Sequence, residues 1–546
     1  MKYNHPLLKS TQSKETKEMA ELNSNNDNNN SDIASFEKSR RLGHQENLML
    51  SLNQLVGPIA QYMSISVIES KKQIQLTQVK QAFAQSITAN YLLGACAKGD
   101  VDSTEAKTFF SPIDQERLKD ESWIPVEEFE LSQTDNDKWT NALPRILSEN
   151  KIDFANGPLW FVKWIKQSTD DEKNNTFSYV LVFVSSHIIM DGKAGHNLIS
   201  NQIVPFLASS CGDTTKDNCN KNSSAKSKRI FFGKPLEQVI YDFNGHELEL
   251  ANRTIPFLIR TATNAFVLKQ NISKKFSNST QEQPVDNHFR EFIIDEATTG
   301  ALVKLSKSKD ISVHSMLMVL VHNALEQARR KFNLALNTGV LLYPIDARKF
   351  QHELSDPHTM PLGDYHKMGQ HKMRNYTNLE DEASLFKMTA EVKSGIQEHN
   401  QPQQEKTIFD CCFHLIQKQN MTLETFNALP APCVLSNLGR NDVISQETTT
   451  TINTNEDCQL EDVISLDESK ETPNNNNATN GQSVVALKSH YFTLQTCAGI
   501  FVSVNTCNNK MHWILSYGKP IESPGAGDFI AETLTNNIRL VVEKYN

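Results

Sequence analysis

The stretch FVSSHIIMDGKAGH, residues 183–196, joins an apolar run to a short polar turn and a helix-like segment. The run 177–186 is mostly apolar and predicts a buried strand. His187 follows directly, and Asp191 and Gly192 come four and five positions later. Because a strand delivers its last residues to a fixed point at the end of a sheet, we expect the His187 ring to project into whatever cleft lies beyond. Gly192 would let the chain turn sharply there into the next helix.

A histidine in this place suits proton transfer. Its unperturbed pKa of about 6.5 lets His187 accept a proton near neutral pH. A general base also needs its ring held in one orientation. Asp191 could fix the turn by accepting hydrogen bonds from backbone amides or by pairing with an arginine. The alternative is a structural histidine near the core, followed by an ordinary Asp-Gly turn.

The composition excludes several classes of protein. The chain has 546 residues, 38% apolar and 22% charged, with a net charge of −9, and therefore no basic footprint for nucleic acid. Its nine cysteines form no CxxC pair, which predicts reduced thiols in the cytoplasm and no zinc motif. The polar N-terminus has no signal-peptide core, and no window approaches the roughly 18 apolar residues of a membrane span.

Three polar, asparagine-rich segments divide the chain. We predict a disordered tail over 1–37, a linker or loop over 209–229, and a low-complexity insertion at about 443–484. They delimit an N-terminal half, 38–208, and a C-terminal half, 230–546, which contains the insertion. Strands and helices mix in both halves, which predicts an α+β protein with mixed sheets.

Individual elements follow from periodicity and capping residues. The strands 159–165 and 177–186 predict an antiparallel hairpin with a long loop. Thr77 would cap a helix over 77–93, and Ser312 a helix over 312–332. A helix is also expected over 193–207 and over 527–545. Further strands are expected over 62–70, 288–295, 338–346, 431–439, 493–506 and 510–517.

Four motifs together resemble one superfamily. SSHIIMDGKAG (185–195) resembles the H-x-x-x-D-G motif of the chloramphenicol-acetyltransferase-like acyltransferases. RRLGHQENLMLSLNQL (40–55) is similar to the N-terminal signature of the fungal alcohol acetyltransferase family within it. LLYPIDARKF (341–350) resembles a strand of the second half, and VLSNLG (434–439) resembles a strand end. The resemblance runs from about residue 38 to the C-terminus.

This resemblance implies two α/β halves with a solvent channel between them. His187 would be the general base that takes the proton of an alcohol as it attacks acetyl-CoA, a co-substrate and not a bound cofactor. Asp191 would be structural, paired with Arg348, and Gly192 would support the motif turn. Ser436 and Asn437 would contact the oxyanion or the acyl-CoA.

The alternatives differ in the acceptor and in catalysis. The leading hypothesis is an O-acetyltransferase that makes acetate esters. An N-acetyltransferase acting on sphingoid bases or related amino alcohols has the same fold and base, and a binding module would keep only the fold. The chain lacks the Asp-Phe-Gly-Trp-Gly motif of plant relatives and the carrier segments of peptide-forming condensation enzymes. We expect a cytoplasmic enzyme that acetylates a small or lipid-like acceptor. We expect it to need no obligate protein partner. Peripheral contact with the endoplasmic reticulum or lipid droplets stays open.

Other histidines and cysteines are expected to have no role in the chemistry. His196 and Asn197 follow the motif by one helical turn and are expected on the helix surface. The histidine-rich segment 350–372 reads as a solvated loop. His314 and His322 lack a ligand partner in register, so we expect no metal site. Cys411 and Cys412 are expected to be buried thiols.

Overall fold

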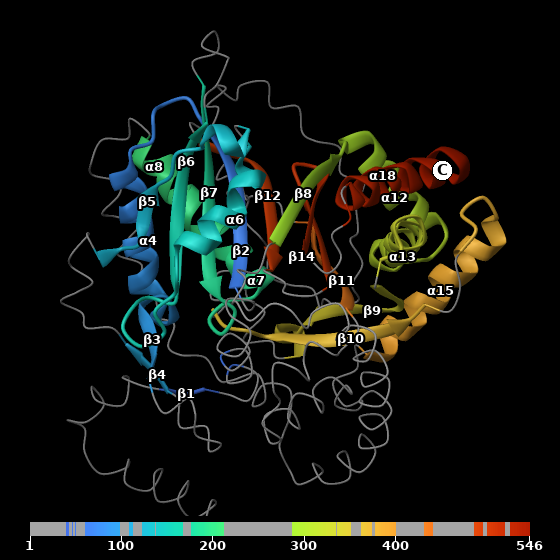
Figure 1. Ribbon diagram of the computed structural model, residues 1–546, viewed down its shortest axis with the longest axis horizontal. Coiled ribbons are helices and arrows are strands. Elements are labelled where there is room, and N and C mark those ends of the chain that lie inside the picture. The colour runs from blue at the N-terminus through green and yellow to red at the C-terminus, as the bar shows by residue number, and fades with distance from the viewer. Residues whose placement is uncertain are drawn as a thin grey trace, which may run out of the picture.

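The computed structural model is a two-lobed α+β protein (Figure 1). The residues it describes are 40–42, 46, 50, 61–98, 109–112, 123–136, 138–167, 176–211, 287–334, 336–350, 362–373, 377–399, 431–440, 485–494, 499–518, 523 and 525–546. The predicted tail, most of the predicted linker, the insertion and Cys411 and Cys412 lie outside these residues. Within them, no helix is long and apolar enough to cross a membrane.

The N-terminal lobe contains a five-stranded sheet in the order β12-β2-β7-β6-β5. Its members are β2 (Gln61–Ser70), β5 (Val126–Glu128), β6 (Trp160–Gln167), β7 (Phe177–Ser186) and β12 (Val485–Leu494). Three helical segments, α4 (Leu76–Ala89), α7 (Gly192–Leu198) and α8 (Val204–Cys211), pack on one face, with the π-helical turn η5 (Ile199–Ile203) joining the last two. Helix α6 (Trp139–Glu149) packs on the other face. Smaller elements complete the lobe: β1 (Arg40–Arg41), β3 (Ala95–Lys98), β4 (Phe109–Pro112), η1 (Tyr91–Gly94) and η3 (Gln133–Asp135).

The C-terminal lobe is built on a mixed six-stranded sheet in the order β10-β9-β11-β13-β14-β8. Its strands are β8 (Asn287–Ile294), β9 (Leu336–Asp346), β10 (His366–Lys372), β11 (Ala431–Arg440), β13 (Ile500–Cys507) and β14 (Lys510–Gly518). Strand β11 runs parallel to both of its neighbours, and the other pairs are antiparallel. The helical segments of this lobe are α12 (Glu296–Ser308), α13 (Val313–Phe332), η6 (Ala347–Phe350), α15 (Glu382–His399) and α18 (Ala526–Tyr545).

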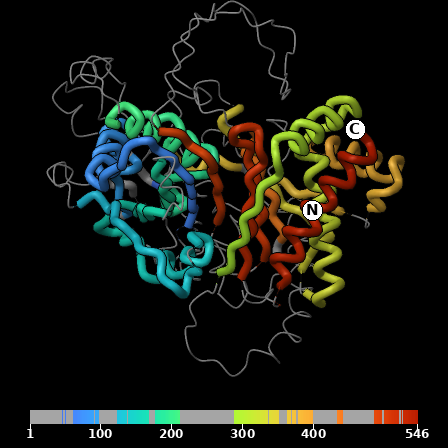
Figure 2. Tube along the Cα trace, turned by 90° about the horizontal axis from the view of Figure 1, so that it is seen from above, coloured from blue at the N-terminus to red at the C-terminus, as the bar shows by residue number. Residues whose placement is uncertain are grey.

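Strand β12 crosses from one lobe to the other. By sequence it belongs to the C-terminal half, yet it pairs antiparallel with β2 over its whole length at the edge of the N-terminal sheet. Figure 2 shows this late strand beside the early strands of the N-terminal lobe. The predicted boundaries assigned β12 to the C-terminal half, and the structure places it in the N-terminal sheet. Because the chain returns at once to the C-terminal sheet as β13, the two lobes are tied together by backbone hydrogen bonds.

The lobes also share an apolar core. The face of the N-terminal sheet that carries Val180 and Val182 packs on α6 and also on Phe289 of β8 and Ile514 of β14. Burial of apolar surface, at roughly 25 cal/mol per Å², makes this contact between the lobes favourable. Strand β7 therefore packs directly against the second lobe.

The predicted fold class is confirmed, and several elements match. The hairpin of β6 and β7 is antiparallel as expected, and Ser312 caps α13 by accepting a hydrogen bond from Ser315 N at 3.0 Å. Three boundaries were wrong. Helix α4 is capped at Gln75, one residue before its start and ahead of Thr77, and it ends at Ala89. The expected strand 493–506 is two elements, because β12 ends at Leu494 and β13 begins at Ile500. The predicted linker also began too early, since α8 continues to Cys211.

Candidate active site

The buried strand β7 places His187 at the junction of the lobes. The strand is central in its sheet, between β2 and β6, and its last residues are fully covered. A turn closes directly after it, in which Ile189 N donates to Ser186 O at 3.2 Å. His187 is 5% exposed. The sequence predicted this placement at the end of a strand.

Asp191 organises the turn that follows. Its Oδ1 accepts a hydrogen bond from Ala194 N at 2.9 Å and so caps α7. Its Oδ2 accepts from Tyr365 N at 2.9 Å and forms an ion pair with Arg348 Nη1, also at 2.9 Å. The predicted pair of Asp191 and Arg348 is thus present, and it joins the motif turn to the second lobe.

Arg348 is the centre of a buried polar network. The residue is 1% exposed. Besides Asp191, it contacts Asp346 Oδ1 at 3.2 Å and donates to Gly363 O at 3.3 Å. The guanidinium carbon also lies 4.7 Å from the ring centroid of Tyr365. A guanidinium with this many partners can stay charged inside the protein, because each contact offsets part of the cost of removing it from water.

Gly192 has little free space beside its Cα and does not need the conformational freedom of glycine. It is the first residue of α7, and its φ angle is not positive. A Cβ there would lie 2.9 Å from Leu438 Cδ2, at the end of β11. Tyr62 also donates a hydrogen bond to Gly192 O at 3.3 Å. The chain does turn into α7 at this point, but the turn needs no positive φ at Gly192, and the Leu438 side chain of β11 packs beside the glycine.

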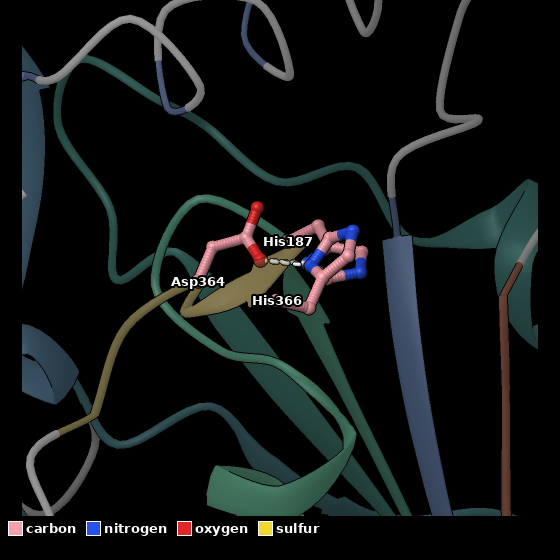
Figure 3. Close-up of side chains that lie close together, drawn as sticks. All are labelled: His187, Asp364 and His366. Carbon is pink, nitrogen blue, oxygen red and sulfur yellow. Dashed lines mark hydrogen bonds and ion pairs between the residues drawn. The ribbon is translucent and has the colours of Figure 1, made fainter. Parts of the chain in front are cut away.

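The segment 362–366 brings two unexpected residues to His187. Asp364 Oδ1 lies 3.6 Å from His187 Nδ1 and also contacts His366 Nδ1 (Figure 3). The rings of His187 and His366 are 4.9 Å apart between centroids. The sequence placed His366 in a solvated loop, which was wrong, because it begins β10 and faces the motif histidine. Nothing in the local pattern around Asp364 indicated this contact.

The backbone of this segment explains why Asp364 lies there. Gly363 forms an isolated bridge with Met190 and adopts φ +143°. A side chain would be strained in that conformation, and its Cβ would lie 2.5 Å from Tyr365 Cε2. The amide of Tyr365 is bound to Asp191, and its carbonyl accepts from Ala347 N at 2.8 Å. Asp364 is thus held between two anchored neighbours.

Burial controls the protonation of His187. Removal from water lowers the pKa of His187 below its ordinary value, and the positive charge of a protonated His366 would lower it further. The carboxylate of Asp364 opposes both effects and raises the pKa. The direction that results is downward, so the imidazole is neutral at pH 7 and able to accept a proton. The donor atoms of His187, Asp364 and His366 lie within 4.8 Å of one another, a spacing that also suits a metal ion.

Ser436 and Asn437 lie on β11, where it pairs with β13. Ser436 is buried. Asn437 Oδ1 accepts a hydrogen bond from Gly439 N at 2.8 Å, where the pairing of β11 with β13 becomes irregular between Asn437 and Arg440. Leu438 reaches the motif at Gly192, so this strand end adjoins the turn after His187. A contact of Ser436 or Asn437 with an oxyanion or acyl-CoA stays a prediction.

The helix after the motif has a polar core. His196 and Asn197 are buried, so their predicted surface position was wrong. The ring of His196 packs edge-on against His490 of β12 at 4.6 Å, and His490 Nδ1 is 2.9 Å from Ser66 Oγ. Burial lowers the pKa of His490 to about 3. These rings became buried because β12 joins this sheet, which the sequence did not reveal.

Comparisons with known proteins agree with this architecture. No protein-family model matches the chain, and no curated protein does. The structure of TRI3 trichothecene 15-O-acetyltransferase from Fusarium sporotrichioides aligns with a TM-score of 0.63 at 10% identity, over 92% of this chain and 95% of that one. The condensation domain of the monacolin K polyketide synthase MokA aligns at 0.52 and 9% identity, over 93% and 98%. The EpoB cyclization-docking bidomain from Sorangium cellulosum aligns at 0.51 and 11%, over 100% and 94%.

At these identities the likeness concerns the fold alone. The chain has the two-lobed fold of chloramphenicol-acetyltransferase-like enzymes and condensation domains. Membership of the fungal alcohol acetyltransferase family stays a hypothesis that rests on the sequence motifs.

Proposed function

We propose that this protein is an acetyl-CoA-dependent O-acetyltransferase with His187 as its general base. The observation that carries the proposal is the setting of His187: a neutral, nearly buried imidazole at the end of a buried strand between two lobes. The turn behind it is fixed by the Asp191–Arg348 pair. Such preorganisation is what a base requires, since misplacing the ring slows proton transfer. The fold shared with an O-acetyltransferase supports the choice of reaction.

The mechanism follows from which ring nitrogen is engaged. His187 Nδ1 faces Asp364, which leaves Nε2 to act on the substrate. Nε2 accepts the hydroxyl proton while the hydroxyl oxygen attacks the carbonyl carbon of the acetyl thioester. A tetrahedral intermediate with an oxyanion results, and donors such as Ser436 would stabilise it. When the C–S bond breaks, the CoA thiolate takes the proton back from Nε2, and the acetate ester leaves.

A direct assay tests the proposal. The purified protein is incubated with acetyl-CoA and a panel of short alcohols, long-chain alcohols and amino alcohols, and release of free CoA is measured. His187→Ala should lower the rate by about 10²- to 10⁴-fold, the usual contribution of a general base. His371→Gln is the matched control, because His371 lies on β10 and packs near Gly395 of α15, away from the trio.

The outcomes separate the candidate functions. Ester formation that depends on His187 supports the proposal. Turnover of the amino alcohols alone, with amide as product, would replace it by N-acetylation. An unchanged rate in His187→Ala would remove the base from its assigned role. If acetyl-CoA is neither bound nor consumed with any acceptor, the result favours the alternative of a non-catalytic binding module.

A further inference from the structure

The trio of His187, Asp364 and His366 has features that proton transfer does not use. His187 Nδ1 is buried and has no hydrogen-bond partner within the described part of the chain. It points toward the carboxylate of Asp364, whose side chain is 0% exposed. The three donor atoms come from two segments that the Asp191–Arg348 network holds together.

Two imidazoles and one carboxylate are a ligand set for zinc. Zn²⁺ binds histidine nitrogen at about 2.0–2.1 Å and carboxylate oxygen at about 2.0–2.2 Å in a tetrahedron, and sites with three protein ligands keep a fourth position for water. Neighbouring donors in such a tetrahedron are about 3.4 Å apart. His187 Nδ1 and Asp364 Oδ1 are 3.6 Å apart. Their positions therefore need little adjustment.

The third ligand must move, and its setting permits this. The hydrogen bond between His366 and Asp364 has to open before an ion can enter between them. The His366 side chain is 13% exposed and begins β10, which is an edge strand of its sheet. The site therefore requires a rotation of the His366 side chain away from Asp364. Nitrogen donors disfavour Ca²⁺ and Mg²⁺, which prefer oxygen ligands.

We propose that His187, Asp364 and His366 form a reversible Zn²⁺ site whose occupation switches off the base. Coordination through Nδ1 leaves a neutral imidazole with its proton on Nε2, so Nε2 donates and no longer accepts a proton. The loss of activity rests on the proposed function. The binding of zinc does not, because it depends only on the three donors.

The binding test uses the full chain without substrates. Co²⁺, a spectroscopic substitute for Zn²⁺, is titrated while the visible absorption of four-coordinate cobalt is followed, and Zn²⁺ is then added as competitor. We expect one equivalent to bind and Zn²⁺ to displace it. His366→Gln and Asp364→Asn should each weaken binding at least about tenfold, because changing even a group that only supports a ligand costs about 10- to 100-fold. His371→Gln should bind like the wild type.

The activity test uses the same variants. Zn²⁺ should inhibit acetyl transfer by the wild type and by His371→Gln, and a chelator should restore the rate. His366→Gln, measured against its own rate without metal, should need at least about tenfold more Zn²⁺ for half-inhibition. Circular dichroism checks that each variant folds. If His366→Gln does not fold, the zinc concentration for half-inhibition is measured on Asp364→Asn instead.

The two proposals fail in different ways. Absence of a one-equivalent Co²⁺ site, or equal binding by wild type, His366→Gln and Asp364→Asn, would overturn the zinc site whatever the activity. Stoichiometric binding without inhibition of an active enzyme would overturn the switch. Lack of turnover with every acceptor would overturn the proposed function, while the cobalt titration still decides the metal site.

Discussion

Arg348→Met should cause the largest loss of stability of any single substitution suggested by the site. The change removes a guanidinium that is 1% exposed and leaves Asp191 buried without its counter-charge. Breaking a buried ion pair by removing one partner costs about 3–5 kcal/mol. Asp191 keeps the amide hydrogen bonds from Ala194 and Tyr365, so we expect a value near the lower end, about 3 kcal/mol.

Urea denaturation followed by tryptophan fluorescence measures this change in unfolding free energy. Arg290→Met is the matched control, because Arg290 Nε contacts Asp528 Oδ1 at 2.6 Å but both side chains are well exposed. An exposed pair contributes about 0–1 kcal/mol. The comparison removes the same chemical group from a buried pair that joins the lobes and from an exposed pair within the C-terminal lobe.

A double variant completes the cycle. The double variant, Asp191→Asn with Arg348→Met, should lose less unfolding free energy than the sum of the losses in the two single variants. The reason is that removing both charges leaves no unpaired charge in the interior. If Arg348→Met costs no more than Arg290→Met, or if the losses at 191 and 348 simply add, the pair does not hold the motif turn to the second lobe.

Three further predictions concern stability. Gly195→Ala should destabilise the protein by about 1–3 kcal/mol in a thermal melt, because the new Cβ would lie 2.4 Å from Tyr62 Cε1. The control is Gly300→Ala in α12, where the space around the Cα is open. That change should be neutral or stabilise the protein by up to about 1 kcal/mol. Ser312→Ala should cost about 1 kcal/mol in urea unfolding through loss of the α13 cap, and no loss would contradict the capping hydrogen bond. The pKa of His490 is about 3 in the folded protein and about 6.5 unfolded, so the unfolded state binds more protons between these values and stability must fall as pH drops from 6.5 toward 3. His490→Phe should flatten the pH dependence of the melting midpoint in that window, and an equal slope in the variant would rule out this histidine as a source.

The sequence predicted elements whose information is local. The β6–β7 hairpin and the Ser312-capped α13 follow from periodicity and a capping residue, and the structure contains both. The resemblance predicted the pair of Asp191 and Arg348, although the two residues are far apart in the chain. The hairpin and the cap follow from local sequence, whereas the ion pair was predicted only through the resemblance.

What the sequence missed depends on long-range exchange. No sequence pattern within β12 indicates that it joins the sheet of the N-terminal lobe. An edge strand has the same kind of residue pattern whichever sheet it joins. That exchange buries His196 against His490, so the error at His196 has the same cause. Similarly, the histidine-rich segment 350–372 has the composition of a solvated loop. Only the folded structure shows that the backbone amide of Tyr365 within it binds Asp191.

This last contact gives Asp191 a wider role than bracing its own turn. One oxygen caps α7, and the other accepts the amide of Tyr365, the residue next to Asp364. Asp191 therefore helps to hold Asp364 near His187, because it binds the amide of the next residue along the chain. Loss of the Asp191 carboxylate would release both the turn that carries the base and the carboxylate behind it. The structural aspartate and the imidazole thus act as one unit, although their side chains share no hydrogen bond among the described contacts.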